Sequence, residues 1–121
     1  MDQTVCMEKV SVPESLPTLG WVFTGVLLMV AVICWAAGAG KIPLNGAVGL
    51  RIPPLTRSTA AWKAGHAAGV VPAVVVFAVG LVCCIVALFA PTLYWGAIAA
   101  LIGGLVWVVI AAVPAANAAE G

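Results

Sequence analysis

Residues 89–96 read FAPTLYWG, and they interrupt a stretch without charged residues that extends over residues 64–119. About 20 residues, at a rise of roughly 1.5 Å each, cross the hydrocarbon core of a bilayer, so this stretch is too long for one membrane helix. Pro91 divides it, because proline has no backbone N–H to donate and its ring clashes with the preceding turn. The stretch therefore predicts two membrane-spanning helices, over residues 70–90 and 92–114, joined by a tight turn.

A further span is expected upstream, where residues 16–40 are also free of charge. We place it over residues 19–39. A secretory signal would begin with basic residues and would have a shorter apolar core. The leader of this chain instead carries Asp2, Glu8 and Glu14 against one lysine. The first helix is therefore expected to stay in the membrane.

The composition favours a membrane protein over a soluble one. Of the 121 residues, 64% are hydrophobic and 7% are charged, and the mean hydropathy is +1.22. A soluble domain needs a charged, hydrated surface that such a chain cannot supply. The net charge of +1 does not indicate a nucleic-acid partner. The expected fold class is an all-α membrane protein with three transmembrane helices.

The expected organisation follows these spans. An extracytoplasmic N-terminal segment (1–18) precedes transmembrane helix 1 (19–39), a basic connector with a short interfacial helix (40–69), transmembrane helix 2 (70–90), transmembrane helix 3 (92–114) and a C-terminal tail (115–121). Pro114 is expected to help end the third span, for the same reason that Pro91 ends the second.

Basic residues predict the orientation. Lys41, Arg51, Arg57 and Lys63 all lie between the first two spans, and short loops rich in lysine and arginine stay in the cytoplasm. The connector and the C-terminus are thus expected inside, and the N-terminus and the Pro91 turn outside.

The aromatic residues fit this orientation. Trp21, Tyr94 and Trp95 would form a belt at the outer interface, and Trp35 would lie near the inner one. Trp107 falls within the third span, where it is expected to pack or to face lipid.

The spans lack the residues that most membrane chemistry needs. No ionisable acid or base lies inside them, which argues against ion-coupled transport. The sequence contains no HExxH motif, no aspartate pair and no serine–histidine pair with an orienting carboxylate, so we expect no enzyme activity and no cofactor. The cysteines Cys6, Cys34, Cys83 and Cys84 form no CxxC motif and have no histidine at ligand spacing, so no metal site is expected.

Small residues recur every four positions on the third span, at Gly96, Ala100 and Gly104. Such a stripe lets helix backbones approach closely in lipid. The alternative is chance in a chain rich in alanine and glycine. If the stripe packs a helix, its partner lies within the chain, on a second copy or on another membrane protein.

The connector reads GKIPLNGAVGLRIPPLTRSTAAWKAGHAAG over residues 40–69. Its first half is rich in glycine and proline, and with Asn45-Gly46 it predicts turns and extended backbone. Its second half predicts a short helix that begins after Ser58 as N-cap, with an incomplete capping box because residue 61 is alanine. We expect Pro72 to bend this helix where it meets the bilayer.

One side of this short helix carries Ser58, Trp62, Gly65, His66 and Gly69. Trp62 would rest at the membrane interface, with the adjacent lysine reaching toward water. His66 is expected to hydrogen-bond to backbone or to a hydroxyl, since a metal role would need further ligands.

The basic residues allow two interpretations. They fix the topology and touch anionic headgroups, or Arg51 and Arg57 bind a phosphate or a carboxylate near a helix N-terminus.

The connector resembles the SdpI/YhfL family of small bacterial integral membrane proteins. The resemblance is carried by Gly49-Leu50-Arg51, Pro53, Ser58, Trp62 and His66, with Pro43 and Asn45 upstream and the order span, loop, span, span. It covers roughly residues 22–112. The chain departs from the family pattern at Ile52, at Thr59, where an acidic residue is common, and at Ala67. Loss of the acidic residue removes an expected partner for an arginine.

The resemblance implies a multi-pass protein of the bacterial plasma membrane. The named member of the family is an immunity protein against a secreted peptide toxin. Because the polar residues are gathered in one connector and the spans lack polar chemistry, we expect a non-enzymatic accessory subunit that binds membrane lipids and a membrane-protein partner or a second copy. The alternatives are immunity to a membrane-active peptide and binding of an anionic lipid or phosphorylated carrier at the inner leaflet. The expected motif and binding residues are Asn45, Gly49, Arg51, Pro53, Arg57, Ser58, Trp62, Lys63 and His66.

Overall fold

The computed structural model describes residues 13–45 and 48–120. Its helices are α2 (Leu16–Gly38), α3 (Pro53–Thr56), α4 (Thr59–Ala87), the 3-10 helix η1 (Pro91–Leu93) and α5 (Tyr94–Glu120). Three of them are long and apolar enough to cross a membrane, and the described part contains no strand. The predicted all-α fold with three spans is confirmed. Most of the expected N-terminal segment, with Cys6, and Gly46 of the expected turn lie outside the described residues.

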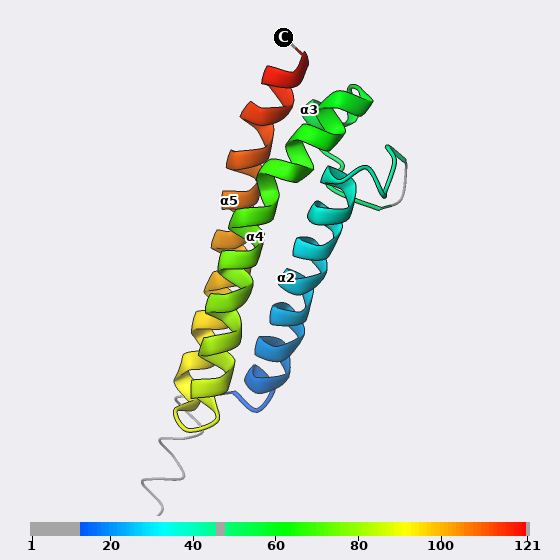
Figure 1. The fold of residues 1–121 in the computed structure, drawn as a ribbon. Helices are drawn as coiled ribbons and strands as arrows, with labels where there is room; N and C mark the ends of the chain where they lie inside the picture. Colours follow the sequence, from blue (N-terminus) through cyan, green and yellow to red (C-terminus); the bar gives the residue numbers. More distant parts are fainter. Residues whose placement is uncertain (1–12, 46–47, 121) are drawn as a thin grey trace, which may run out of the picture.

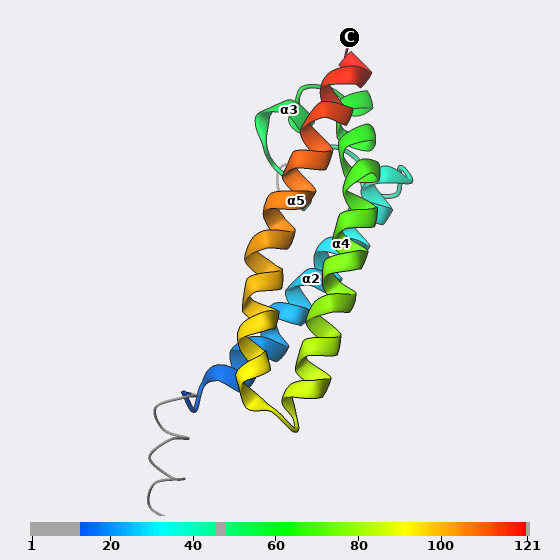
Figure 2. The same ribbon diagram turned by 90° about the vertical axis from the view of Figure 1, so that its left-hand side faces the viewer.

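The long helices form an elongated antiparallel bundle (Figure 1). α4 packs against both α2 and α5. The connector, α3 and the C-terminal end of α5 gather at one end of the bundle, and Figure 2 shows α3 beside the last turns of α5. The start of α2 and the η1 turn lie at the other end. The chain is thus a multi-pass membrane protein with its basic connector beside its C-terminal end.

The turn at Pro91 separates α4 from α5 as the sequence predicts. α4 ends at Ala87, and the amides of Phe89 and Ala90 donate to the carbonyl of Val86 at 2.9 and 3.0 Å. Pro91 then opens η1, where the missing N–H costs nothing because first-turn amides have no partner within the helix. The two spans are therefore joined by a few residues.

α4 and α5 both continue through a proline, and for α5 this differs from the sequence expectation. The predicted short helix is the first part of α4, which runs through Pro72 into the second span, where the sequence predicts a bend. α5 runs through Pro114 to Glu120, so this proline does not end the third helix as predicted. One proline removes one backbone hydrogen bond, and the bonds on either side of it can hold the helix.

Small and apolar residues pack the helices at three levels along the bundle. Near the Pro91 turn the buried residues are Leu16, Cys84, Ala87, Tyr94 and Ala97. In the middle they are Ala31, Cys34, Ala73 and Val108. Near the connector they are Leu55, Ala61, Ala112 and Ala116. The third level includes α3, so the connector is part of the packed structure.

The expected small-residue stripe faces α4. A Cβ atom added at Gly104 would lie 2.5 Å from a methyl carbon of Val76, and one added at Gly96 would lie 2.8 Å from the Cys83 sulfur. Contact this close requires glycine, because a methyl group would overlap the α4 side chain. The stripe thus finds its partner within the chain.

Two expected aromatic belt residues meet at the Pro91 end. The Trp21 indole donates a hydrogen bond of 3.2 Å to the Tyr94 hydroxyl, which links α2 to α5. Tyr94 is buried, whereas Trp21 and Trp95 are exposed. Trp107 is also exposed on α5, so of its two expected positions the lipid-facing one agrees with the structure.

Candidate functional site

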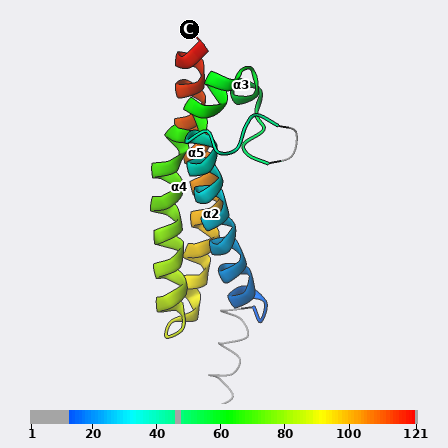
Figure 3. The same cartoon turned by 45° about the vertical axis from the view of Figure 1, so that its right-hand side comes forward.

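The connector contains a helical turn, α3, in the half that the sequence predicts as loop. Pro53 occupies the first turn, where proline is well tolerated, after Ile52 in an extended conformation. Leu55 is fully buried and fills the space above Gly65 of α4. Burial of this leucine stabilises the turn by about 1.5–3 kcal/mol, which a solvated loop would not gain. Figure 3 shows α3 at the side of the bundle, near the C-terminal end of α5.

Ser58 begins α4 in the manner that the sequence predicts. Its backbone is extended, and its hydroxyl accepts a hydrogen bond of 3.1 Å from the amide of Ala61. This bond satisfies one of the first amides of the helix, which have no partner within it. The position of Ser58 therefore sets where the connector ends and where α4 begins.

Trp62 fixes the connector to α4 through a hydrogen bond. Its side chain is fully buried, and its indole N–H donates to the carbonyl of Ile42 at 2.9 Å. The sequence expectation placed this tryptophan at the lipid interface, and the structure corrects it, because the connector folds back over the ring. Trp62 thus recognises a backbone group of the connector, whatever side chain residue 42 carries.

His66 holds the connector at a second point. Its Nε2 accepts from the amide of Leu50 at 2.8 Å, and its Nδ1 lies 2.7 Å from the carbonyl of Trp62. An amide N–H can bond only to an unprotonated nitrogen, so Nδ1 carries the single proton and the imidazole is neutral. Of the two expectations for His66, hydrogen bonding to backbone is the one found.

Gly49 lets the connector approach these two side chains. Its φ of +114° is in the region that favours glycine. A Cβ atom here would lie 2.5 Å from Cη2 of Trp62 and 3.0 Å from Nε2 of His66. The two rings are themselves in contact, with centroids 4.3 Å apart. We call Ile42, Gly49, Leu50, Trp62 and His66 the connector latch.

Four cations lie at this end of the bundle, and we call them the basic surface: Lys41, Arg51, Arg57 and Lys63. All four are exposed. The Lys41 amine lies 4.9 Å from the centroid of the Trp35 ring, within the range of a cation–π contact. The Arg57 guanidinium donates to the side-chain oxygen of Asn117 in α5 at 3.0 Å.

The sequence supplies almost no negative charge to balance the basic surface. No aspartate or glutamate occurs between Glu14, just before α2, and Glu120, the last residue of α5, which ends at the connector end. The four cations outnumber this one glutamate, so the electrostatic potential at the connector end is positive, and an anionic ligand or surface would be attracted to it.

The structure brings together only part of the predicted motif. Gly49, Trp62 and His66 meet in the latch, while Ser58 and Pro53 shape the adjacent helix starts. Asn45 acts locally: its side chain donates to the Pro43 carbonyl at 2.6 Å and accepts from the Val48 amide at 2.7 Å. The predicted anion site at the helix N-terminus by Arg51 and Arg57 has no such organisation among the described contacts, because Arg57 is directed to α5.

Sequence reasoning missed Leu55 and Asn117. Asn117 is the one uncharged polar amide in a C-terminal helix of apolar residues, and this isolation was a signal that it has a partner. The roles of Ile42 and Leu50 in the latch could not be predicted from their side chains, because Trp62 and His66 bind their backbone groups.

No group of three potential metal ligands exists among residues 13–45 and 48–120. Cys34, Cys83 and Cys84 are free thiols within the bundle. The chemistry that the described site offers is hydrogen bonding and positive charge.

Comparison of the chain with family models, with curated proteins and with solved structures found no match. The resemblance to the SdpI/YhfL family stays a prediction from the connector residues.

Proposed function

We propose that this chain is a non-enzymatic accessory protein of the bacterial plasma membrane that works by binding an anionic partner at its basic surface. The connector end faces the cytoplasm in this proposal, and the Pro91 turn faces outward. The orientation follows from the placement of lysine and arginine, and the bacterial membrane follows from the family resemblance.

One observation carries the proposal: Lys41, Arg51 and Arg57 belong to the part of the connector before α4, which is fixed to α4, and Lys63 lies on α4 itself. A loop needed only for topology requires positive charge but no defined backbone path. Here Trp62 and His66 bind the connector backbone at two points, 2.9 Å from Ile42 and 2.8 Å from Leu50. Fixing the backbone lowers the entropy that the cations lose when they bind a ligand, which raises affinity.

The test is crosslinking in living cells. A photoreactive amino acid replaces Ala60, which is exposed in the first turn of α4, three positions after Arg57. We expect a discrete adduct on irradiation, and we expect the double substitution Arg51→Gln with Arg57→Gln to abolish it. Charge is the attractive term, so the adduct should also weaken as salt rises in isolated membranes.

The matched control places the photoreactive residue at Thr92, exposed at the opposite end of the bundle. Thr92 should not give the same adduct. An Ala60 adduct that keeps its yield without the two arginines, or the absence of any adduct specific to Ala60, would contradict the proposal.

Protection against a membrane-active peptide toxin is the second candidate. It is supported by the meeting of Gly49 with Trp62 and His66, three residues of the family resemblance. Deletion should then sensitise cells to a secreted toxin, and Trp62→Ala should weaken complementation more than Trp107→Ala. Unchanged growth of the deletion strain under peptide toxins would refute it.

A further inference from the structure

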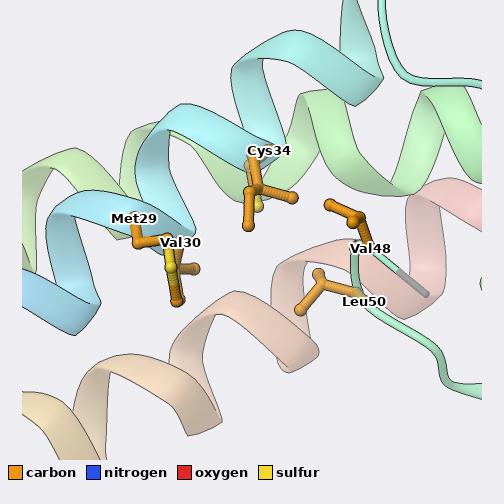
Figure 4. A pocket seen from close by; sticks show the side chains of 7 residues that line it. Met29, Val30, Cys34, Val48 and Leu50 are labelled. Atoms are coloured by element: carbon orange, nitrogen blue, oxygen red, sulfur yellow. The ribbon is translucent and has the colours of Figure 1, made fainter.

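A cavity of about 390 Å³ lies between α2 and the connector. Figure 4 shows side chains of α2 and of the connector on its two sides, with α5 close by. The lining residues are Met29, Val30, Ile33, Cys34, Val48, Gly49 and Leu50. The volume is within the range of about 300–1,000 Å³ that is typical of small-molecule sites.

The lining suits a hydrocarbon chain. None of its side chains is charged, and the inner end is closed by Cys34, which is fully buried. Met29 and Val48 at the rim are 54% and 42% exposed. Met29 belongs to the α2 span, so we expect this part of the rim to face the bilayer, where a lipid chain can enter from the side without crossing water.

The connector residues that line the cavity are followed directly by a positively charged residue. Arg51 follows Leu50 directly, is exposed, and has no acidic residue near it in the sequence. The latch holds this wall in place, since the Leu50 amide is bonded to His66. An amphiphile with one apolar chain and an anionic head matches both features, because the chain fills the cavity and the head meets the guanidinium.

We propose that this cavity binds one acyl chain of an anionic phospholipid whose phosphate contacts Arg51. The inference rests on the proposed function in one respect, that the connector end faces an anionic ligand. Two further cavities lie on the outer faces of the helices. One is lined by α5 alone and another by α2 and α4, and neither has a wall from the connector.

Native mass spectrometry tests the proposal on the full chain, released from detergent after incubation with phosphatidylglycerol or with phosphatidylcholine of the same acyl chains. We expect one retained phosphatidylglycerol and little phosphatidylcholine. Ile33→Trp and Met29→Trp fill the cavity, and Arg51→Gln removes the charge. Each should lower the retained fraction about tenfold, the loss expected for one charge-assisted hydrogen bond or one buried chain segment.

A matched control separates the cavity from the membrane surface in general. Val22→Trp adds the same ring at an exposed position of α2 outside the cavity. This variant should retain lipid as the unmodified chain does. Circular dichroism confirms folding, and Met29→Trp alters an exposed residue, so at least one cavity variant stays informative.

Equal retention of both lipids, or retention unaffected by Ile33→Trp and Met29→Trp, would overturn the proposal. Lipid retention that depends on the cavity while Ala60 gives no crosslinked partner would instead refute the proposed function alone. A charge-dependent Ala60 adduct without lipid retention would refute the lipid site alone.

Discussion

At the scale of single residues, the latch explains why polar side chains are concentrated next to the second span. Trp62 and His66 bind backbone groups, so they require no particular side chain at positions 42 and 50. They do require the absence of a side chain at Gly49. The constraint on the sequence therefore falls on one glycine and two rings.

Gly49→Ala should destabilise the protein by about 1–3 kcal/mol, because alanine is strained at positive φ and its methyl group would overlap the Trp62 ring. Thermal unfolding in detergent measures this. Gly25→Ala is the control, since a Cβ at Gly25 meets nothing within 4 Å. Equal stability of the Gly49 variant and the unmodified chain would show that the connector does not rest on Trp62.

Trp62→Phe should cost about 1 kcal/mol, and His66→Ala about 1–3 kcal/mol, because each leaves a backbone group of the connector without its partner. Together the two changes should cost less than their sum, since either one frees the same segment. A double-mutant cycle of unfolding free energies measures this coupling. Trp107→Phe, at an exposed position, should have little effect. Full additivity would mean that the two bonds act separately.

At the scale of elements, sequence periodicity and charge predict which segments are helices but not where they end. The uncharged runs and Pro91 were enough for three spans. The start of α4 at Thr59 was likewise predicted, from the Ser58 cap, whereas the continuation of α5 through Pro114 to Glu120 was not. α3 was missed because its glycine- and proline-rich surroundings favour a loop and only Leu55 burial favours a helix.

The Ser58 cap gives a prediction for α4. Ser58→Ala should raise hydrogen–deuterium exchange of the first turn and cost about 0.5–2 kcal/mol, whereas Ser58→Asp should keep the cap. Exchange measured by mass spectrometry on peptides covering residues 58–64 reports this. Equal exchange in the alanine and aspartate variants would contradict a capping role.

Neighbouring glycines test the contact between α4 and α5. Gly104→Ala should destabilise by about 1–3 kcal/mol through overlap with Val76. Gly103→Ala, which meets nothing within 4 Å, should be neutral or stabilise by about 0.5–1 kcal/mol. Val76→Ala should partly restore the Gly104 variant. If both glycine variants unfold alike, the packing face of α5 is different from the one described.

At the scale of the whole molecule, three spans place the two ends of the bundle on opposite sides of the membrane. The sequence alone predicted the gathering of cations in one connector, because charge is visible residue by residue. It could not predict that Arg57 would reach Asn117, sixty positions away, or that the connector would wall a cavity with α2. Both depend on how the connector packs against α2 and α5 at this end of the bundle.

Orientation is tested with reporter fusions. Green fluorescent protein after Glu120 should fluoresce, and alkaline phosphatase inserted after Thr92 should be active, because the lysine and arginine of the connector hold that end in the cytoplasm. Replacing Lys41, Arg51, Arg57 and Lys63 by glutamine should reduce both signals. Fluorescence of a fusion at Thr92, together with an active phosphatase after Glu120, would show that the orientation is the opposite one.

The central claim is that a fixed connector, and not positive charge alone, makes the binding surface. The most direct measurement is the yield of the Ala60 crosslink in the Gly49→Ala chain, which keeps every cation. We predict a yield several-fold below that of the unmodified chain and close to that of the double arginine variant, at equal amounts of protein in the membrane. A yield equal to that of the unmodified chain, with the Gly49 variant measurably less stable, would contradict it.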